Sequence, residues 1–205
     1  MVEARIQQQF FESADLAYQV ADSLARPIAD AAQAAVGCLT AGGKLLACGQ
    51  GGSQWLAQWL CSALMLRFER ERPPLAALAL GPSLAQPVFP LGGAEVDASL
   101  ALALQVRALG QPGDLLVACC ALADDAAVRA AIHEAHAKEM SVVLLGGGAG
   151  AQEPGALASL LGETDVCIAV PHERLARVHE LHLLALHALC DAIDIQLLGD
   201  SDDPV

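Results

Sequence analysis

The residues best suited to chemistry form a glycine-rich run, Gly49-Gln50-Gly51-Gly52-Ser53, between an apolar segment and a long helical pattern. Glycines let the backbone turn sharply and leave amide groups facing outward. Ser53 could cap the helix that follows, and the N-terminal end of a helix favours an anion. The run therefore predicts a strand, a loop and a helix that together form the mouth of a small-molecule site, although it could also be only the turn that the fold needs.

Further reactive side chains lie later in the chain. Asp124 and Asp125 follow an apolar run and could either recognise a basic partner or occupy a helix N-terminus, where acidic residues are favoured. His179 and His187 lie eight residues apart, on nearly the same face of a predicted helix, so a site with two histidine ligands is conceivable. Because no carboxylate or third histidine opposes them, we predict no metal and no other cofactor.

Composition and charge narrow the classes of protein. Eleven Lys and Arg stand against 24 Asp and Glu, a formal charge of −13, which argues against direct binding to nucleic acid or to an anionic membrane but is compatible with a basic protein partner. Hydrophobic residues make up 55% of the chain, more apolar surface than a small monomer can hide, so we expect a homo-oligomer. The seven cysteines lie mostly inside apolar runs, and no signal or membrane-spanning pattern is evident, which predicts reduced thiols and a cytoplasmic protein.

Strands and helices are predicted to alternate along the chain around these residues. Apolar runs predict five strands at 45–48, 75–80, 115–120, 141–145 and 166–170, with helices between them. Such alternation implies a parallel sheet in a three-layer α/β/α fold, with ligands outside the carboxyl ends of the strands. Two N-terminal helices, the second beginning at Pro27, and a long C-terminal helix at 173–198 complete the prediction of a single domain with a helical extension at 1–41, an α/β core at 42–199 and an acidic tail at 200–205.

Five segments carry a resemblance to a known family: 49–53, 67–75, 105–110, 112–114 and 177–182. Together they resemble the sugar isomerase (SIS) domain proteins of the phosphoheptose isomerase group, over nearly the whole chain. Within that group the chain is most similar to initiator-associating proteins of the DiaA type. The resemblance implies a SIS fold and a homo-oligomer, a tetramer, that binds the replication initiator DnaA.

The resemblance also implies which residues should do chemistry, and several are replaced. Relatives that bind sugar phosphates carry a loop of the form S-T-S-G-N-S, where this chain has Cys120-Ala121-Leu122-Ala123-Asp124-Asp125. A phosphate about 4 Å from one of these carboxylates would cost about 1 to 4 kcal/mol.

The catalytic positions implied by the resemblance are also altered. The catalytic His and Glu of the helix after the glycine loop correspond to Trp59 and Ala63, which can neither transfer a proton nor hold a metal. On the last helix a Gln corresponds to His179, and the catalytic His to His187. We therefore predict no catalytic residues.

The sequence thus predicts a catalytically inactive SIS-domain protein that binds DnaA. Two alternatives stay open: a sedoheptulose 7-phosphate (phosphoheptose) isomerase, and a module that binds a carbohydrate derivative without converting it. The candidate ligand-binding residues lie in the glycine loop, after the third strand and on the last helix: Gly49, Gln50, Gly51, Gly52, Ser53, Cys120, Asp124, Asp125 and Glu180.

Overall fold

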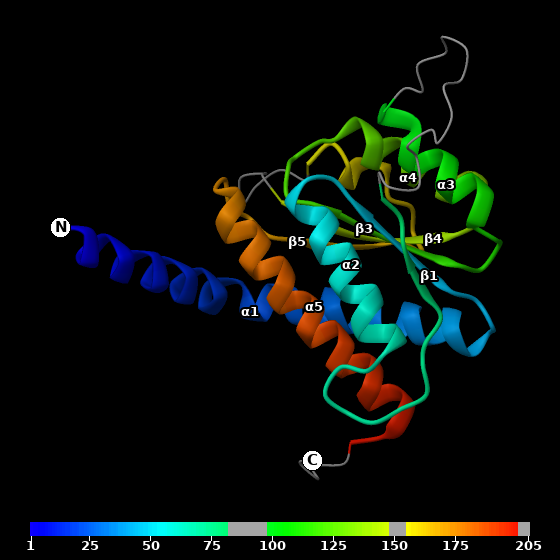
Figure 1. Ribbon diagram of the computed structural model, residues 1–205, viewed down its shortest axis with the longest axis horizontal. Coiled ribbons are helices and arrows are strands. Elements are labelled where there is room, and N and C mark those ends of the chain that lie inside the picture. Colours follow the sequence, from blue (N-terminus) through cyan, green and yellow to red (C-terminus); the bar gives the residue numbers. More distant parts are fainter. Residues whose placement is uncertain (82–97, 148–154, 201–205) are drawn as a thin grey trace.

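A computed structural model describes residues 1–81, 98–147 and 155–200 (Figure 1). At its centre is a parallel sheet of five strands in the order β2-β1-β3-β4-β5. The strands are β1 (Leu45–Gly49), β2 (Ala77–Ala79), β3 (Leu115–Cys120), β4 (Ser141–Gly146) and β5 (Val166–Ala169). All five predicted strands are present.

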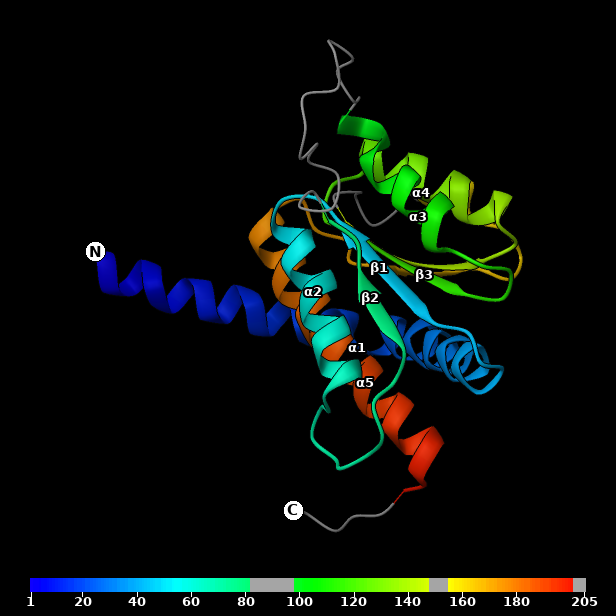
Figure 2. The same cartoon turned by 45° about the vertical axis from the view of Figure 1, so that its right-hand side comes forward.

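Helices cover both faces of the sheet, which confirms the predicted three-layer fold. Figure 2 shows α3 (Ala101–Leu109) and α4 (Ala126–Ala137) on one side and α1 (Val2–Thr40), α2 (Gly52–Met65) and α5 (Leu175–Leu198) on the other. Two short 3₁₀ segments, Ala98–Leu100 and Ala158–Leu160, complete the described elements. Because both faces are covered, every residue of β1 and β3 is buried, which explains why these strands read as continuous apolar runs.

The order of the strands decides where a ligand can bind. The chain leaves β1 toward β2 on one side and returns through β3 on the other, so the crevice of this sheet opens at the carboxyl ends of β1 and β3. Gly49, the last residue of β1, pairs in register with Cys119. The glycine loop and the loop after β3 therefore leave the sheet side by side.

The prediction of two N-terminal helices is wrong, because α1 is one helix of 39 residues that runs through Pro27. A proline inside a helix costs about 3 kcal/mol. Here apolar residues are buried on both sides of it, from Leu16, Val20 and Leu24 to Ala31 and Ala35. Fully burying even two large side chains yields about that much, so packing keeps the helix continuous.

The C-terminal part of the chain differs from the prediction only in its boundaries. The last helix, α5, begins at Leu175 rather than at 173. By length and composition α5 could cross a membrane, but ten of its residues are buried in this fold, where it packs mainly against α1 and also against α2, as a core helix does. Of the predicted acidic tail, only Asp200 is among the described residues, and 201–205 lie outside them.

Candidate active site

A cavity of about 210 Å³ opens at the carboxyl edge of the sheet, where the crevice is expected. Its walls come from the glycine loop, from the end of β3 and the loop after it, and from the first turns of α5. The lining residues are Gln50, Gly51, Gly52, Ser53, Cys119, Cys120, Ala121, Leu122, Asp125, Leu175 and His179. Six of the nine residues predicted to bind a ligand are among them, whereas Gly49, Asp124 and Glu180 are not.

The glycine loop is shaped by backbone conformation and close packing. Gly51 has φ of +55°, in the left-handed region that favours glycine. The amides of Ser53 and Gln54 donate to the carbonyls of Gln50 and Gly51, at 3.0 and 3.2 Å, and start α2. Gly51 is the N-cap and no side chain caps the helix, so the prediction that Ser53 caps it is wrong. Ser53 instead lies in the first turn, and its hydroxyl points elsewhere.

That hydroxyl joins the glycine loop to the other two walls. Ser53 Oγ accepts a hydrogen bond from the backbone amide of Ala121 at 3.3 Å and lies 3.2 Å from His179 Nε2. Because a hydroxyl oxygen has two lone pairs, Ser53 Oγ can accept a second hydrogen bond, from the Nε2–H of His179, which leaves the other ring nitrogen unprotonated. Burial lowers the pKa of His179 below its ordinary value of 6.5, so the ring is neutral at pH 7 and one nitrogen can accept a proton.

The ring of His179 lies directly against Gly52. A Cβ atom at Gly52 would lie 2.7 Å from His179 Cε1, closer than side chains approach one another. The second glycine of the G-G-S sequence therefore gives the histidine its space. This contact explains why the loop and the last helix, 126 positions apart between Ser53 and His179, form one site.

The two adjacent aspartates take different places. Asp125 is the N-cap of α4, where its Oδ1 accepts from the amides of Ala127 and Val128 at 2.9 and 3.0 Å, and it also lines the cavity. Asp124 is exposed, pairs with Arg129 and lies outside the cavity. The capping interpretation of this pair applies to Asp125 alone.

The cysteines beside the cavity are poor nucleophiles. Burial raises the pKa of the Cys120 thiol to about 11, and the charges of Asp125 and Asp124 add to the effect. Burial likewise raises the pKa of the Cys119 thiol. Because the thiolate is the reactive form, both residues act here as small wall residues. All seven cysteines of the chain are free and lie in the described part.

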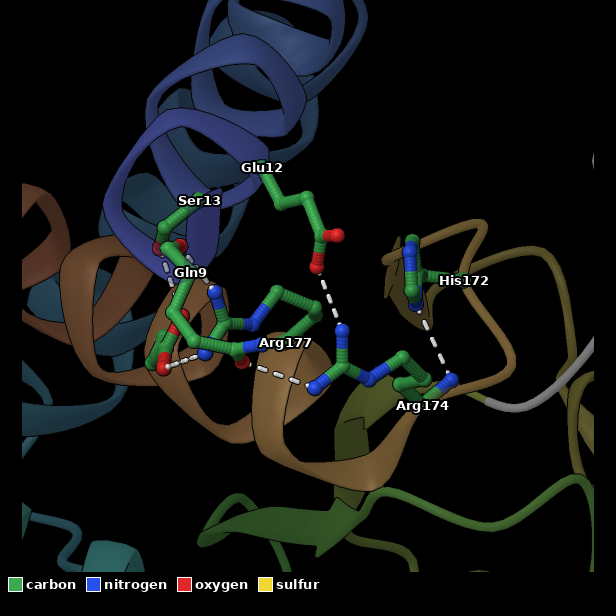
Figure 3. Close-up of polar contacts among 7 residues, drawn as sticks. Gln9, Glu12, Ser13, His172, Arg174 and Arg177 are labelled. Carbon is green, nitrogen blue, oxygen red and sulfur yellow. Dashed lines mark hydrogen bonds and ion pairs between the residues drawn. The ribbon is translucent and has the colours of Figure 1, made fainter. Parts of the chain in front are cut away.

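Glu180 is not among the residues that line the cavity. It pairs with Arg177 where α5 meets α1, and Figure 3 shows Arg177 beside Gln9 and Ser13 of α1. The carboxylate of Glu180 accepts from Ser13 Oγ and from the guanidinium of Arg177, each at 2.5 Å. Arg177 is 5% exposed and also donates to the carbonyl of Gln9, while Arg174 donates to the Gln9 side chain at 2.8 Å. These contacts fix the beginning of α5, the helix that carries His179, against α1.

The positions matched to family catalysts lie away from the cavity. Trp59, on α2, packs against His187 with ring centroids 4.7 Å apart and against Phe68 at 5.9 Å. Ala63 is buried one turn further along α2. His187 is about 12 Å from His179 along α5, because a helix rises 1.5 Å per residue, so the two histidines do not share a site. Among the residues that the structure describes, no group of three or more His, Cys, Asp or Glu could hold a metal.

Sequence reasoning missed Cys119, Ala121, Leu122 and Leu175 as lining residues and did not place His179 in the ligand set. The register of β1 with β3 is the signal that could have found the first three, because it puts 119–122 beside the glycine loop. Leu175 lies one helical turn before His179, on the same side of α5.

Comparison with known proteins identifies the family. The model of the SIS domain matches residues 9–147, about two thirds of the chain. The chain belongs to the SIS domain family. A relative from Methylibium petroleiphilum, named phosphoheptose isomerase, is 52% identical over 202 residues. The alignment covers 98% of this chain and 98% of the relative. Another of the same name, from Aromatoleum aromaticum, is 43% identical, with 97% of each chain covered.

Solved structures agree with this assignment to the phosphoheptose isomerase group of the SIS family. Phosphoheptose isomerase GmhA from Neisseria gonorrhoeae superposes with a TM-score of 0.83 at 35% identity, covering 95% of this chain and 99% of that one. A phosphoheptose isomerase from Francisella tularensis gives a TM-score of 0.85 at 38% identity, with 95% and 98% covered.

These matches overturn the prediction of a catalytically inactive, DnaA-binding protein, because full-length relatives bear the name of an enzyme. The prediction inferred inactivity from the replaced loop at 120–125 and from Trp59 and Ala63, and neither of these two residues lines the cavity. The side chain there that can exchange a proton near neutral pH is His179, which comes from α5.

Proposed function

We propose that this chain is a phosphoheptose isomerase, which interconverts sedoheptulose 7-phosphate and the corresponding aldose phosphate. The observation that carries the proposal is the neutral imidazole of His179, held at Ser53 inside the cavity at the crevice of the sheet. The name shared by the relatives supports the choice of substrate.

The proposed reaction needs one group that moves a proton between neighbouring carbons. A base removes a proton from C1 of the ketose, and the electron pair forms an enediolate with the negative charge on the C2 oxygen. The proton of the C1 hydroxyl passes to the C2 oxygen, and the base delivers a proton to C2, which leaves a carbonyl at C1 and gives the aldose. The unprotonated ring nitrogen of His179 is the proposed base, because burial keeps the imidazole neutral at pH 7. The N-terminus of α2, at Gly51 and Gly52, favours the negative charge that develops on the sugar oxygens.

Turnover measured with the wild-type protein and with His179→Gln tests the proposal. Loss of a general base lowers kcat by about 10² to 10⁴ fold, and we expect a loss of that size. The matched control is His133→Gln, an exposed histidine of α4 outside the cavity, which should keep the activity of wild type. No turnover by wild type, or equal loss in both variants, would contradict the proposal. The acidic limb of the wild-type pH profile is expected below pH 6.5, since the pKa of His179 is lowered.

The protein is also proposed to work as a homo-oligomer joined through α1. The first half of this helix projects from the body (Figure 1) and carries large apolar side chains in water. Ile6 is 53% exposed, Phe10 73%, Phe11 66% and Tyr18 88%. Contiguous apolar surface of this kind is typical of protein interfaces. A second copy of this chain carries the same exposed apolar side chains and could cover them. The assembly that we propose is a tetramer.

A reducing compartment, the cytoplasm, is the proposed location. Its support is the chemistry of the thiols: seven free cysteines, six of them buried, are typical of proteins kept in reducing surroundings.

A further inference from the structure

The end of the cavity nearest α4 carries an unusual charge for a sugar-phosphate site. The first amides of a helix normally form a ready anion site, because they are unpaired and lie at the positive end of the helix dipole. In this chain Asp125 Oδ1 already accepts from two of them, those of Ala127 and Val128. The amides are therefore satisfied inside the protein, and a negative charge occupies the place of an anionic ligand.

No cation among the lining residues offsets this charge. The titratable groups that line the cavity are Asp125, His179 and the thiols of Cys119 and Cys120. His179 is neutral at pH 7 and both thiols stay protonated. Arg129, in the first turn of α4, pairs with Asp124 and does not line the cavity. A phosphate placed at the α4 end would therefore meet an uncompensated carboxylate.

The same carboxylate is well suited to a hydroxyl group. The second oxygen of Asp125 makes no hydrogen bond to any described residue, so it can accept one from a ligand. Cys120, Leu122 and Leu175 supply apolar wall against which a carbon chain can pack. Hydrogen bonds to a charged acceptor are about twice as strong as those between neutral groups.

We infer that Asp125 sets the specificity of the cavity: its α4 end receives an uncharged, hydroxyl-bearing part of the ligand and excludes phosphate. A sugar phosphate then binds with its phosphate directed away from α4. The inference rests on the proposed function for the sugar, but binding alone can test it, so an inactive wild-type protein would refute the proposed function without touching the inference.

Titration calorimetry with inorganic phosphate and with unphosphorylated sedoheptulose is the test, on wild type, Asp125→Gly and Asp124→Gly. Glycine is an acceptable N-cap that costs only a few tenths of a kcal/mol, and it leaves the amides of α4 free. We expect Asp125→Gly to bind phosphate at least about tenfold more tightly than wild type, about 1.4 kcal/mol. The same variant should bind sedoheptulose at least about fivefold more weakly, having lost the hydroxyl acceptor.

Asp124→Gly is the matched control, because it removes the same charge one residue away and outside the cavity. It should bind both probes within about twofold of wild type. Wild-type protein that binds phosphate as tightly as Asp125→Gly would overturn the inference. An equal gain of phosphate binding in both variants would also overturn it, since that result would make the effect one of net charge. Thermal unfolding of each variant verifies that it is folded.

Discussion

His182 shows how differently two histidines one turn apart can behave. His179 lines the cavity, whereas His182 is fully buried and its Nε2 lies 2.9 Å from the carbonyl of Gly146, to which it donates. Its Nδ1 has no partner among the described residues. Burial is the main cause that lowers the pKa of His182 to about 4, and the nearby His179 adds to it. The residue therefore serves the core in its neutral form.

The stability of the protein should fall in mild acid because of His182. Its folded pKa of about 4 is below the unfolded value of 6.5, so the unfolded chain binds the proton first as the pH drops. The contribution of neutral His182 to the free energy of unfolding is complete above about pH 6.5 and is lost as the pH falls toward 4. Between pH 7 and pH 5 the linkage amounts to about 2 kcal/mol of the free energy of unfolding, measurable by urea denaturation.

His182→Gln should reduce that dependence on pH, at the cost of lower stability at pH 7, because glutamine can donate to Gly146 but does not titrate. The exposed His133, changed to Gln, is the matched control and should leave the dependence as in wild type. An unfolding free energy of wild type that does not change between pH 7 and pH 5 would contradict this account of His182.

At the scale of residues, six of the nine predicted ligand residues line the cavity, and four of these lie in the glycine loop, because glycine spacing after an apolar strand is a local signal. The contact of Ser53 with His179 could not be predicted, since it depends on how α5 lies against Gly52. Glu180 was predicted as a ligand residue, but it does not line the cavity although His179, the residue before it, does. On a helix the next residue points about 100° away, toward α1 in this case.

Among the elements, α5 and the segment that follows α2 are joined by an ion pair that is closed to water. Arg72 Nε donates to Asp194 at 2.5 Å, and both side chains are 1% exposed. The same guanidinium donates to the carbonyls of Leu64 and Ala63 and so satisfies the C-terminal end of α2. The second oxygen of Asp194 has no partner among the described residues. Arg72 thus does two tasks at once, neutralising a buried charge and ending a helix.

Replacing Arg72 with Met should destabilise the protein by about 3 to 5 kcal/mol, because it leaves Asp194 as an uncompensated charge in the core. The matched control is Arg67→Met, which removes an exposed arginine paired with Glu71 and should change stability by less than about 1 kcal/mol. The double variant with Arg72→Met and Asp194→Leu should recover most of the loss. Equal effects of the two single variants in urea unfolding would refute the role assigned to this pair.

The elements themselves were largely predictable. Strands buried on both faces gave unmistakable apolar runs, and their alternation with helices specified a parallel sheet. The prediction of a helix break at Pro27 was wrong, because the burial of apolar residues along α1 outweighs the local tendency of proline to end a helix. The short 3₁₀ segment at Ala158–Leu160 was expected as a helix because its apolar residues carry no signal of length.

At the scale of the whole molecule, the projecting first half of α1 leaves large apolar side chains uncovered in a single chain. If it joins subunits as proposed, Phe10→Ser together with Phe11→Ser should lower the oligomeric state, because each phenylalanine contributes about 1.5 to 3 kcal/mol when buried. Sedimentation velocity measures the result. Gln7→Ser with Gln8→Ser, in the same exposed turns, is the matched control and should sediment as wild type does. A monomeric wild-type protein would refute the assembly.

The net negative charge of the chain is compatible both with an enzyme that acts on a small molecule and with a protein that binds a basic protein. Charge alone could therefore argue against nucleic-acid binding but could not choose between these two functions. Relatives matching 98% of the chain supplied the choice. Composition could not reveal that the imidazole of His179, on the last helix, lines the cavity.

Exchange of hydrogen between the sugar and the solvent reveals whether His179 removes a proton from C1. Wild-type protein is incubated with sedoheptulose 7-phosphate in D₂O and the sugar is followed by proton NMR. An enediolate formed by His179 predicts loss of one C1 proton signal as deuterium enters, with the aldose appearing, and neither change with His179→Gln. Sugar that keeps both C1 protons in the presence of the wild-type protein would contradict the assignment of this cavity as an isomerase site.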